Sequence, residues 1–124
     1  MKNLVYLVLL FVAFSAQAQQ KNKNAKVSVE VNGNCEQCKK RIEKAAYSVP
    51  GVKSAEWHID DKVLHLIINE TKCSVTDVEK AVAKIGHDTK NVKADDETYN
   101  NLHHCCKYDR KEWYAYHIPY KRTH

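Results

Sequence analysis

The stretch Gly33-Asn34-Cys35-Glu36-Gln37-Cys38 separates two segments with different hydrophobic periods. Before it, residues 26–31 (KVSVEV) alternate with a period of two, which predicts a half-buried strand. After it, apolar residues recur at helical spacing over residues 38–48, and Pro50-Gly51 ends the predicted helix. The two cysteines therefore lie at a predicted strand-to-helix junction.

The chain then predicts a hairpin, with strands at residues 52–59 and 62–68 around Asp60-Asp61. In this hairpin Trp57 and Leu64 face the predicted core. His58 and His65 fall on the opposite face and are interpreted as solvated surface residues.

A second helix is predicted to begin after Ser74, a good N-cap with Asp77 three residues further on, and to end near Gly86. Residues 89–93 predict a short last strand. The order strand, helix, strand, strand, helix, strand predicts an α+β fold, the ferredoxin-like βαββαβ sandwich, with a short C-terminal extension.

The N-terminus has the pattern of a secretory signal peptide. Lys2 precedes an apolar run over residues 4–14, and Ala16-Gln17-Ala18 is a small-x-small exit site. The run is too short to span a bilayer, so the mature form is expected to have no stable membrane span and to be periplasmic or secreted.

Composition and these boundaries predict four segments. They are a signal peptide at 1–18, a disordered leader at 19–25, one folded domain at 26–93 and the extension at 94–124. The net charge of +5 is spread along the chain without a window that interleaves basic and aromatic residues, so no nucleic-acid partner is expected.

Cys35 and Cys38 are spaced so that a loop sulfur and a sulfur in the first helical turn can point at one ion. The helix N-terminus and the nearby Lys39, Lys40 and Arg41 are expected to favour thiolate over thiol. Thiolates select soft ions, so Cu(I) is the first choice and Hg(II) or Zn(II) the alternatives, although zinc usually asks for four ligands. The other interpretation is a disulfide, because export leads to an oxidising space.

Residues 26–93 resemble the heavy-metal-associated domain of copper chaperones, copper-pumping ATPases and periplasmic mercury-binding proteins. The similarity lies in the Cys35–Cys38 motif and its flanks, in Val49-Pro50-Gly51-Val52 and in Ala83-Lys84-Ile85-Gly86-His87. The resemblance implies the same fold, a metal held by Cys35 and Cys38, and transfer of Cu(I) to a similar domain such as that of a copper-transporting ATPase.

Two positions depart from the family pattern. Gly33 stands where the family usually has a methionine packed under the loop, which predicts a less supported loop. His87 stands where bacterial members commonly have tyrosine near the loop. It is therefore a candidate third, exchangeable ligand, with a surface imidazole as the other interpretation.

The extension contains His103-His104-Cys105-Cys106, four possible ligands in a row. Adjacent cysteines can face one ion only in a turn or by bridging to other ligands, and Cys105 or Cys106 can join Cys35 and Cys38 if the extension folds back. A disulfide that fixes the tail and plain exposure are the alternatives. Cys73 is interpreted as a small buried hydrophobic residue.

These features favour an exported soft-metal binder, a metallochaperone or scavenger rather than an enzyme. The competing hypothesis is a thiol-disulfide oxidoreductase that attacks with Cys35. Against it, the residues between the two cysteines are Glu36 and Gln37, where thioredoxin-type motifs have aromatic or proline neighbours.

Overall fold

The computed structural model of the chain describes residues 2–7 and 20–111. The expected signal-peptide exit site at 16–18 lies outside the described residues. No helix in the described part of the chain is long and apolar enough to cross a membrane.

The domain consists of three strands and two long helices, followed by two short helices in the extension. The elements are β1 (Ala25–Glu30), α2 (Glu36–Tyr47), β2 (Val52–His58), β3 (Val63–Ile68), α3 (Val75–Lys84), α4 (Asp96–Asn100) and the 3₁₀ helix η2 (His104–Cys106). Their order agrees with the predicted α+β, ferredoxin-like arrangement.

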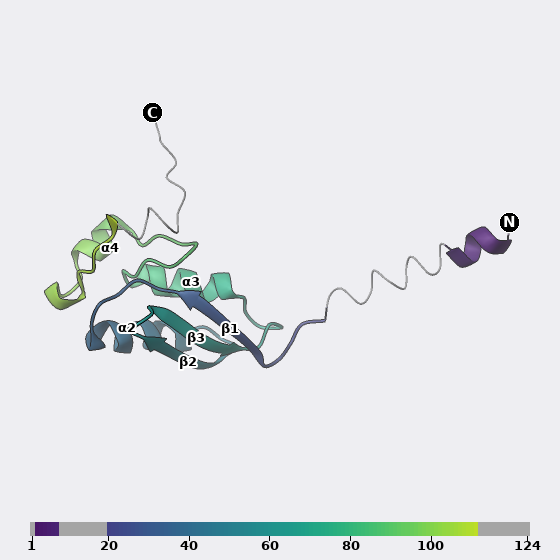
Figure 1. Cartoon of the computed structure of the whole chain (residues 1–124), viewed down its shortest axis with the longest axis horizontal. Coiled ribbons are helices and arrows are strands. Elements are labelled where there is room, and N and C mark those ends of the chain that lie inside the picture. The colour runs from purple at the N-terminus through teal and green to yellow at the C-terminus, as the bar shows by residue number, and fades with distance from the viewer. Residues whose placement is uncertain (1, 8–19, 112–124) are drawn as a thin grey trace, which may run out of the picture.

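The sheet has the strand order β1-β3-β2, and both pairs are antiparallel. The long helices α2 and α3 lie on one face of the sheet, and the other face is open (Figure 1). Trp57, Leu64 and Leu66 point from the sheet into the layer between sheet and helices, where Ile42 and Val82 meet them. Alternation along the strands leaves His58 and His65 exposed on the open face, as the sequence predicted.

The predicted second helix is confirmed together with its start signal. Ser74 is the N-cap, and its hydroxyl accepts from the Asp77 N–H while the Asp77 carboxylate accepts from the Ser74 N–H. The helix ends at Lys84 with Ile85 as its C-cap, and Gly86 follows with a φ of 107°, which suits glycine.

The prediction of a last strand at residues 89–93 is wrong. Within the described residues this segment makes one isolated bridge, Val31 to Thr89, beside β1. The buried carboxylate of Glu79 accepts hydrogen bonds from the Thr89 hydroxyl at 2.7 Å and from the Asn91 N–H at 2.9 Å. These bonds hold the segment as a loop, which stops the ladder after a single pair.

Candidate metal centre

Cys35 is the N-cap of α2. Its backbone is extended, with φ −150° and ψ 169°, and its Sγ accepts from the Cys38 N–H at 3.4 Å. A sulfur at this position meets the free N–H groups and the positive end of the helix. Cys38 lies in the first turn and is fully buried, so the predicted placement of one cysteine before the helix and one in its first turn is confirmed.

The extension brings two more sulfurs to the same place. The Sγ atom of Cys35 lies 3.2 Å from that of Cys38, 3.6 Å from that of Cys106 and 3.8 Å from that of Cys105. The Cys105 and Cys106 sulfurs are 3.9 Å apart. Cys35 therefore stands at the centre of a sulfur cluster formed by Cys35, Cys38, Cys105 and Cys106.

Neighbouring cysteines converge here because η2 is a tight turn. The Cys106 N–H donates to the His103 carbonyl at 2.8 Å, and this closes the 3₁₀ turn that aims both sulfurs at Cys35. Cys106 is fully buried, whereas Cys35 and Cys105 are partly exposed. Two of the four sulfurs are thus accessible from outside.

The three sulfurs of Cys35, Cys105 and Cys106 form a triangle that fits a metal ion. The point equidistant from them is about 2.2 Å from each, close to the Zn–S length of about 2.3 Å. The edge between Cys35 and Cys38 is shorter, 3.2 Å against the roughly 3.8 Å that two thiolates on a tetrahedral ion require. Cys38 lies outside the group of three sulfurs that are within 4.8 Å of one another, so its side chain must move to join the same ion.

The thiols differ in acidity. Burial raises the pKa of Cys35, but hydrogen bonds from the Cys38 thiol and N–H, and from Cys106 and Cys105, outweigh it and leave this pKa lowered. Burial raises the pKa of Cys38, and burial together with hydrogen bonds to the neighbouring thiols raises the pKa of Cys106 further above its ordinary value. Cys35 therefore ionises before Cys38 and Cys106, and an incoming ion must displace the protons of these two thiols.

The basic residues after the motif have a different role from the predicted one. Lys39 Nζ pairs with the Glu43 carboxylate at 2.8 Å and donates to the Trp57 carbonyl at 2.9 Å. Arg41 donates to the Ile85 carbonyl at 2.8 Å. These two side chains join α2 to the sheet and to α3. The pKa of Cys35 is lowered by hydrogen bonds and not by these basic residues.

The cysteine loop is supported by Trp57. A Cβ atom at Gly33 would lie 3.0 Å from the tip of the Trp57 ring and 3.2 Å from the Cys38 Cβ. The indole is fully buried, and its Nε1 donates to the Val31 carbonyl at 3.0 Å. The expected loss of support at Gly33 is therefore wrong: the indole fills the space that a side chain at this position would need.

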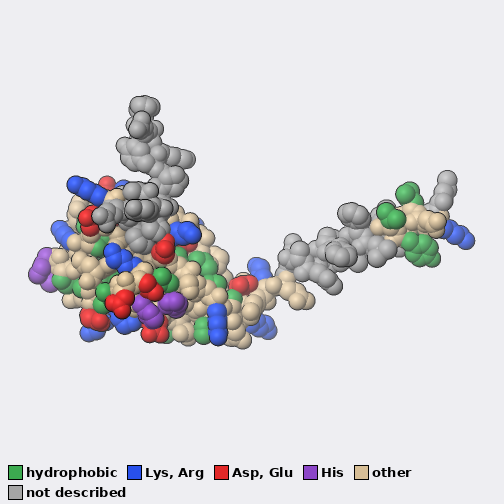
Figure 2. All heavy atoms as spheres, viewed as in Figure 1, with side chains coloured by type: hydrophobic (Ala, Val, Ile, Leu, Met, Phe, Trp, Pro, Cys, Tyr) green, Lys and Arg blue, Asp and Glu red, His purple; other side chains and the backbone are tan. Residues whose placement is uncertain are grey.

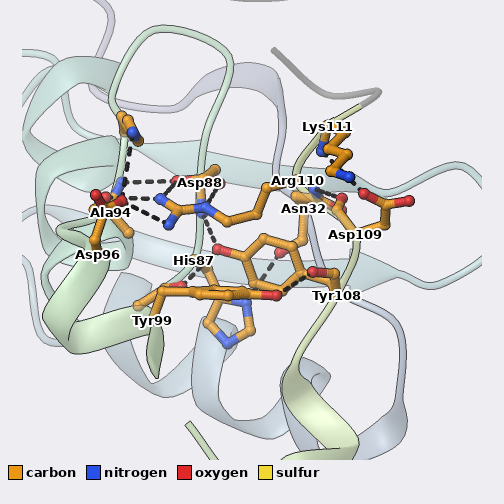
Figure 3. A network of polar contacts seen from close by, with 12 residues as sticks. Asn32, His87, Asp88, Ala94, Asp96, Tyr99, Tyr108, Asp109, Arg110 and Lys111 are labelled. Atoms are coloured by element: carbon orange, nitrogen blue, oxygen red, sulfur yellow. Dashed lines mark hydrogen bonds and ion pairs between the residues drawn. The ribbon is translucent and has the colours of Figure 1, made fainter. Parts of the chain in front are cut away.

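A polar clamp fixes the extension to the domain (Figure 3). Arg110 binds the fully buried carboxylate of Asp88 through two bonds of 2.8 and 2.9 Å, and it also donates to the Ala94 carbonyl at 2.8 Å. The Tyr108 hydroxyl accepts from the Asp88 N–H at 2.9 Å and donates to the Gly86 carbonyl at 2.6 Å. The clamp holds the chain directly after Cys106.

Sequence reasoning missed this clamp. Asp88 and Arg110 are 22 residues apart, and no local pattern links them. The one signal in the sequence was their opposite charge: Asp88 follows His87, and Arg110 comes shortly after the cysteine pair.

His87 is fully buried, in contrast to the surface imidazole that was the alternative interpretation. Its Nδ1 lies 2.9 Å from the Asn32 carbonyl, and the ring stacks on Tyr108 with centroids 5.4 Å apart. Since a carbonyl only accepts, Nδ1 carries the proton and Nε2 has a free lone pair, without a partner among the described residues. Burial lowers the pKa of His87 to about 4. The ligand atoms that lie within 4.8 Å of one another at this centre are those of Cys35, Cys105 and Cys106. They do not include His87, so its role as a ligand stays a prediction.

Cys73 is buried, 7% exposed, and packs under Gly51 with its sulfur 3.0 Å from a Cβ built there. It makes no contact with the sulfur cluster among the described hydrogen bonds. The interpretation as a small buried hydrophobic residue agrees with this position.

The ferredoxin-like α+β fold, with a cysteine pair at the strand-to-helix junction, agrees with the heavy-metal-associated domain that the sequence resembles. Similar proteins of known structure or function belong to the same class. No family model matches the chain. The copper chaperone CopZ of Staphylococcus epidermidis is 30% identical over 63 residues, which are 50% of this chain and 93% of the relative.

Among solved structures, the N-terminal domain of a potential copper-translocating P-type ATPase from Bacillus subtilis, in its Cu(I)-loaded state, has a TM-score of 0.51 at 28% identity. The match covers 53% of this chain and 84% of that one. A CopZ metallochaperone has the same fold, with a TM-score of 0.51 at 24% identity over 52% of this chain and 98% of that one. The chain belongs to the heavy-metal-associated domain family.

Proposed function

We propose that this chain binds a soft metal ion, with Cu(I) as first choice, through the thiolates of Cys35, Cys38, Cys105 and Cys106. It acts as an exported metallochaperone or scavenger and not as an enzyme. The observation that carries the proposal is the convergence of three sulfurs from two distant segments on Cys35: those of Cys38, Cys106 and Cys105 lie 3.2, 3.6 and 3.8 Å from its Sγ.

The donor set supports a soft ion. All four donors of the proposed site are sulfur, and thiolate selects Cu(I) over hard cations. The staphylococcal relative is a copper chaperone, and the similar Bacillus domain was solved in a Cu(I)-loaded state. Zn(II) and Hg(II) remain the alternatives, since four thiolates also suit them.

Partial exposure supports transfer of the ion. Cys35 and Cys105 are the accessible sulfurs, whereas Cys38 and Cys106 are buried. An acceptor thiolate can therefore attack the ion from the exposed side and replace one ligand at a time. A similar domain of a copper-transporting ATPase is the proposed partner.

A titration of the reduced chain with Cu(I) against a competing chelator tests the metal proposal. Cys35→Ser/Cys38→Ser is expected to abolish competition with the chelator. Cys105→Ser/Cys106→Ser is expected to weaken affinity by more than the roughly tenfold that loss of an outer partner costs at a metal site, since two of the four proposed ligands are lost. Cys73→Ala is the matched control and should bind like the parent.

Equal affinity of the parent and Cys35→Ser/Cys38→Ser would overturn the proposal. An insulin-reduction assay separates it from the oxidoreductase hypothesis, because catalytic turnover contradicts a chain that only binds metal.

Export is tested separately by the mass of the protein recovered from its host. We expect a chain that begins at Gln19 in the periplasmic or secreted fraction. Full-length chain retained in the cytoplasm would contradict export and leave the metal proposal unaffected.

A further inference from the structure

The open face of the sheet contains a second group of possible metal ligands, unrelated to the sulfur cluster. His58, Asp61 and His65 each offer one ligand atom, and these atoms lie within 4.8 Å of one another. His58 ends β2, Asp61 lies in the turn, and His65 is in β3, so the hairpin itself brings the three together. Histidine side chains are visible on this face of the molecule (Figure 2).

The two imidazole rings are close, with centroids 4.8 Å apart and an angle of 50° between their planes. The cross-strand register explains this proximity: Glu56 is opposite His65, and His58 follows two residues later on the same face. The hairpin is well ordered by its own bonds, among them the Val63 N–H to Asp61 Oδ1 bond at 3.0 Å. The second oxygen of Asp61 remains for an ion.

Each imidazole has one nitrogen that is held by a neighbour. His58 Nε2 lies 3.2 Å from the Glu56 carboxylate, and His65 Nδ1 lies 3.2 Å from the Ser28 hydroxyl. In the described structure the other ring nitrogen of each has no hydrogen-bond partner. Metal-binding histidines commonly have an outer partner, such as the Glu56 carboxylate beside His58, that orients the ring and fixes its tautomer.

We propose that His58, Asp61 and His65 form a second metal site, which binds a divalent cation of borderline softness such as Zn²⁺. Two imidazoles and one carboxylate are ligands that Zn²⁺ accepts, and the exposed position lets water complete the coordination. The site differs in chemistry from the sulfur cluster, and it does not depend on whether the thiols bind metal.

The test is a Zn²⁺ titration of the full chain followed by the imidazole carbon-proton NMR signals. The signals of His58 and His65 are expected to shift together and to saturate, whereas Mg²⁺ should leave them unchanged. Zinc that binds only to thiols would not move these two signals, so the readout separates the two sites.

Two neighbouring aspartates provide a matched pair of variants. Asp61→Asn keeps the turn bond from the Val63 N–H but loses the anionic ligand, and it should weaken Zn²⁺ binding by about tenfold or more. Asp60→Asn removes the same charge from the same turn and should leave the affinity as in the parent. Ser28→Ala, which removes an outer partner, should weaken binding as well.

Two results would overturn the proposal. One is that the His58 and His65 signals stay in place up to millimolar Zn²⁺. The other is that Asp60→Asn and Asp61→Asn weaken binding equally, which would indicate attraction by general charge. The same spectra report whether each variant is folded.

Discussion

At the scale of single residues, Gly33 and Trp57 decide how the cysteine loop is supported. The indole tip occupies the space that a side chain at residue 33 would need, 3.0 Å from a Cβ there. A small residue and a large aromatic ring thus replace the methionine that the family resemblance implies at residue 33. The sequence showed the departure, but the ring that compensates for it comes from β2, 24 residues further along the chain.

We predict that Gly33→Ala destabilises the chain by about 1–3 kcal/mol, because the added methyl group overpacks a buried contact. Chemical denaturation measures this loss. In a Trp57→Phe background the same substitution should cost clearly less, since the shorter ring leaves room. An equal cost in both backgrounds would contradict the role of the indole.

His87 predicts a pH dependence. Its pKa is lowered by burial to about 4, against an ordinary value of about 6.5 in the unfolded chain. The unfolded state therefore binds more protons between these values, so stability is fully present above pH 6.5 and is lost as the pH falls toward 4. The fall amounts to at most about 3 kcal/mol.

Denaturation of the metal-free chain between pH 7 and pH 5 measures this slope. Most carboxylates stay ionised over this range, so His87 should dominate. The slope should be much smaller in His87→Gln. A parent chain with constant stability from pH 7 to pH 5 would contradict the buried neutral imidazole.

At the scale of elements, local patterns predicted what local forces determine. The alternation of β1, the periodicity of α2 and the capping box of Ser74 and Asp77 all lie within a few residues, and the structure has each of them. The predicted last strand does not form, because Glu79 on α3 accepts hydrogen bonds from Thr89 and Asn91 and holds this segment as a loop. The docking of η2 was left open because the Asp88–Arg110 pair joins residues with no common pattern.

The clamp gives a prediction for the extension. Arg110→Ala leaves the buried carboxylate of Asp88 without its guanidinium, which typically costs about 3–5 kcal/mol for a buried pair. We expect the extension to separate from the domain. Cys106, which is fully buried in the parent chain, should then react faster with an alkylating reagent.

Mass spectrometry of the alkylated peptides measures the rate at each cysteine. Cys73 is an internal control, because it lies in the domain core and should stay protected while the domain is folded. Lys111 is an exposed neighbour of Arg110, and in Lys111→Ala the alkylation rate of Cys106 should equal that of the parent. A rise at Cys73 equal to that at Cys106 would indicate global unfolding and contradict a separate clamp.

At the scale of the whole molecule, the described residues form a ferredoxin-like domain and an extension that returns to the cysteine loop. The extension supplies two of the four sulfurs, and the clamp at Asp88 holds them in place. The sequence identified all four cysteines, but only the folded chain places Cys105 and Cys106 beside Cys35. A soft-metal site in this chain therefore depends on tertiary structure well beyond the two-cysteine motif.

X-ray absorption at the copper edge of the Cu(I)-loaded chain tests this central claim most directly, because it counts the sulfur neighbours of the metal. We expect more than two sulfurs around Cu(I) in the parent and two in Cys105→Ser/Cys106→Ser. Two sulfurs in both proteins would contradict a shared site and confine the metal to Cys35 and Cys38.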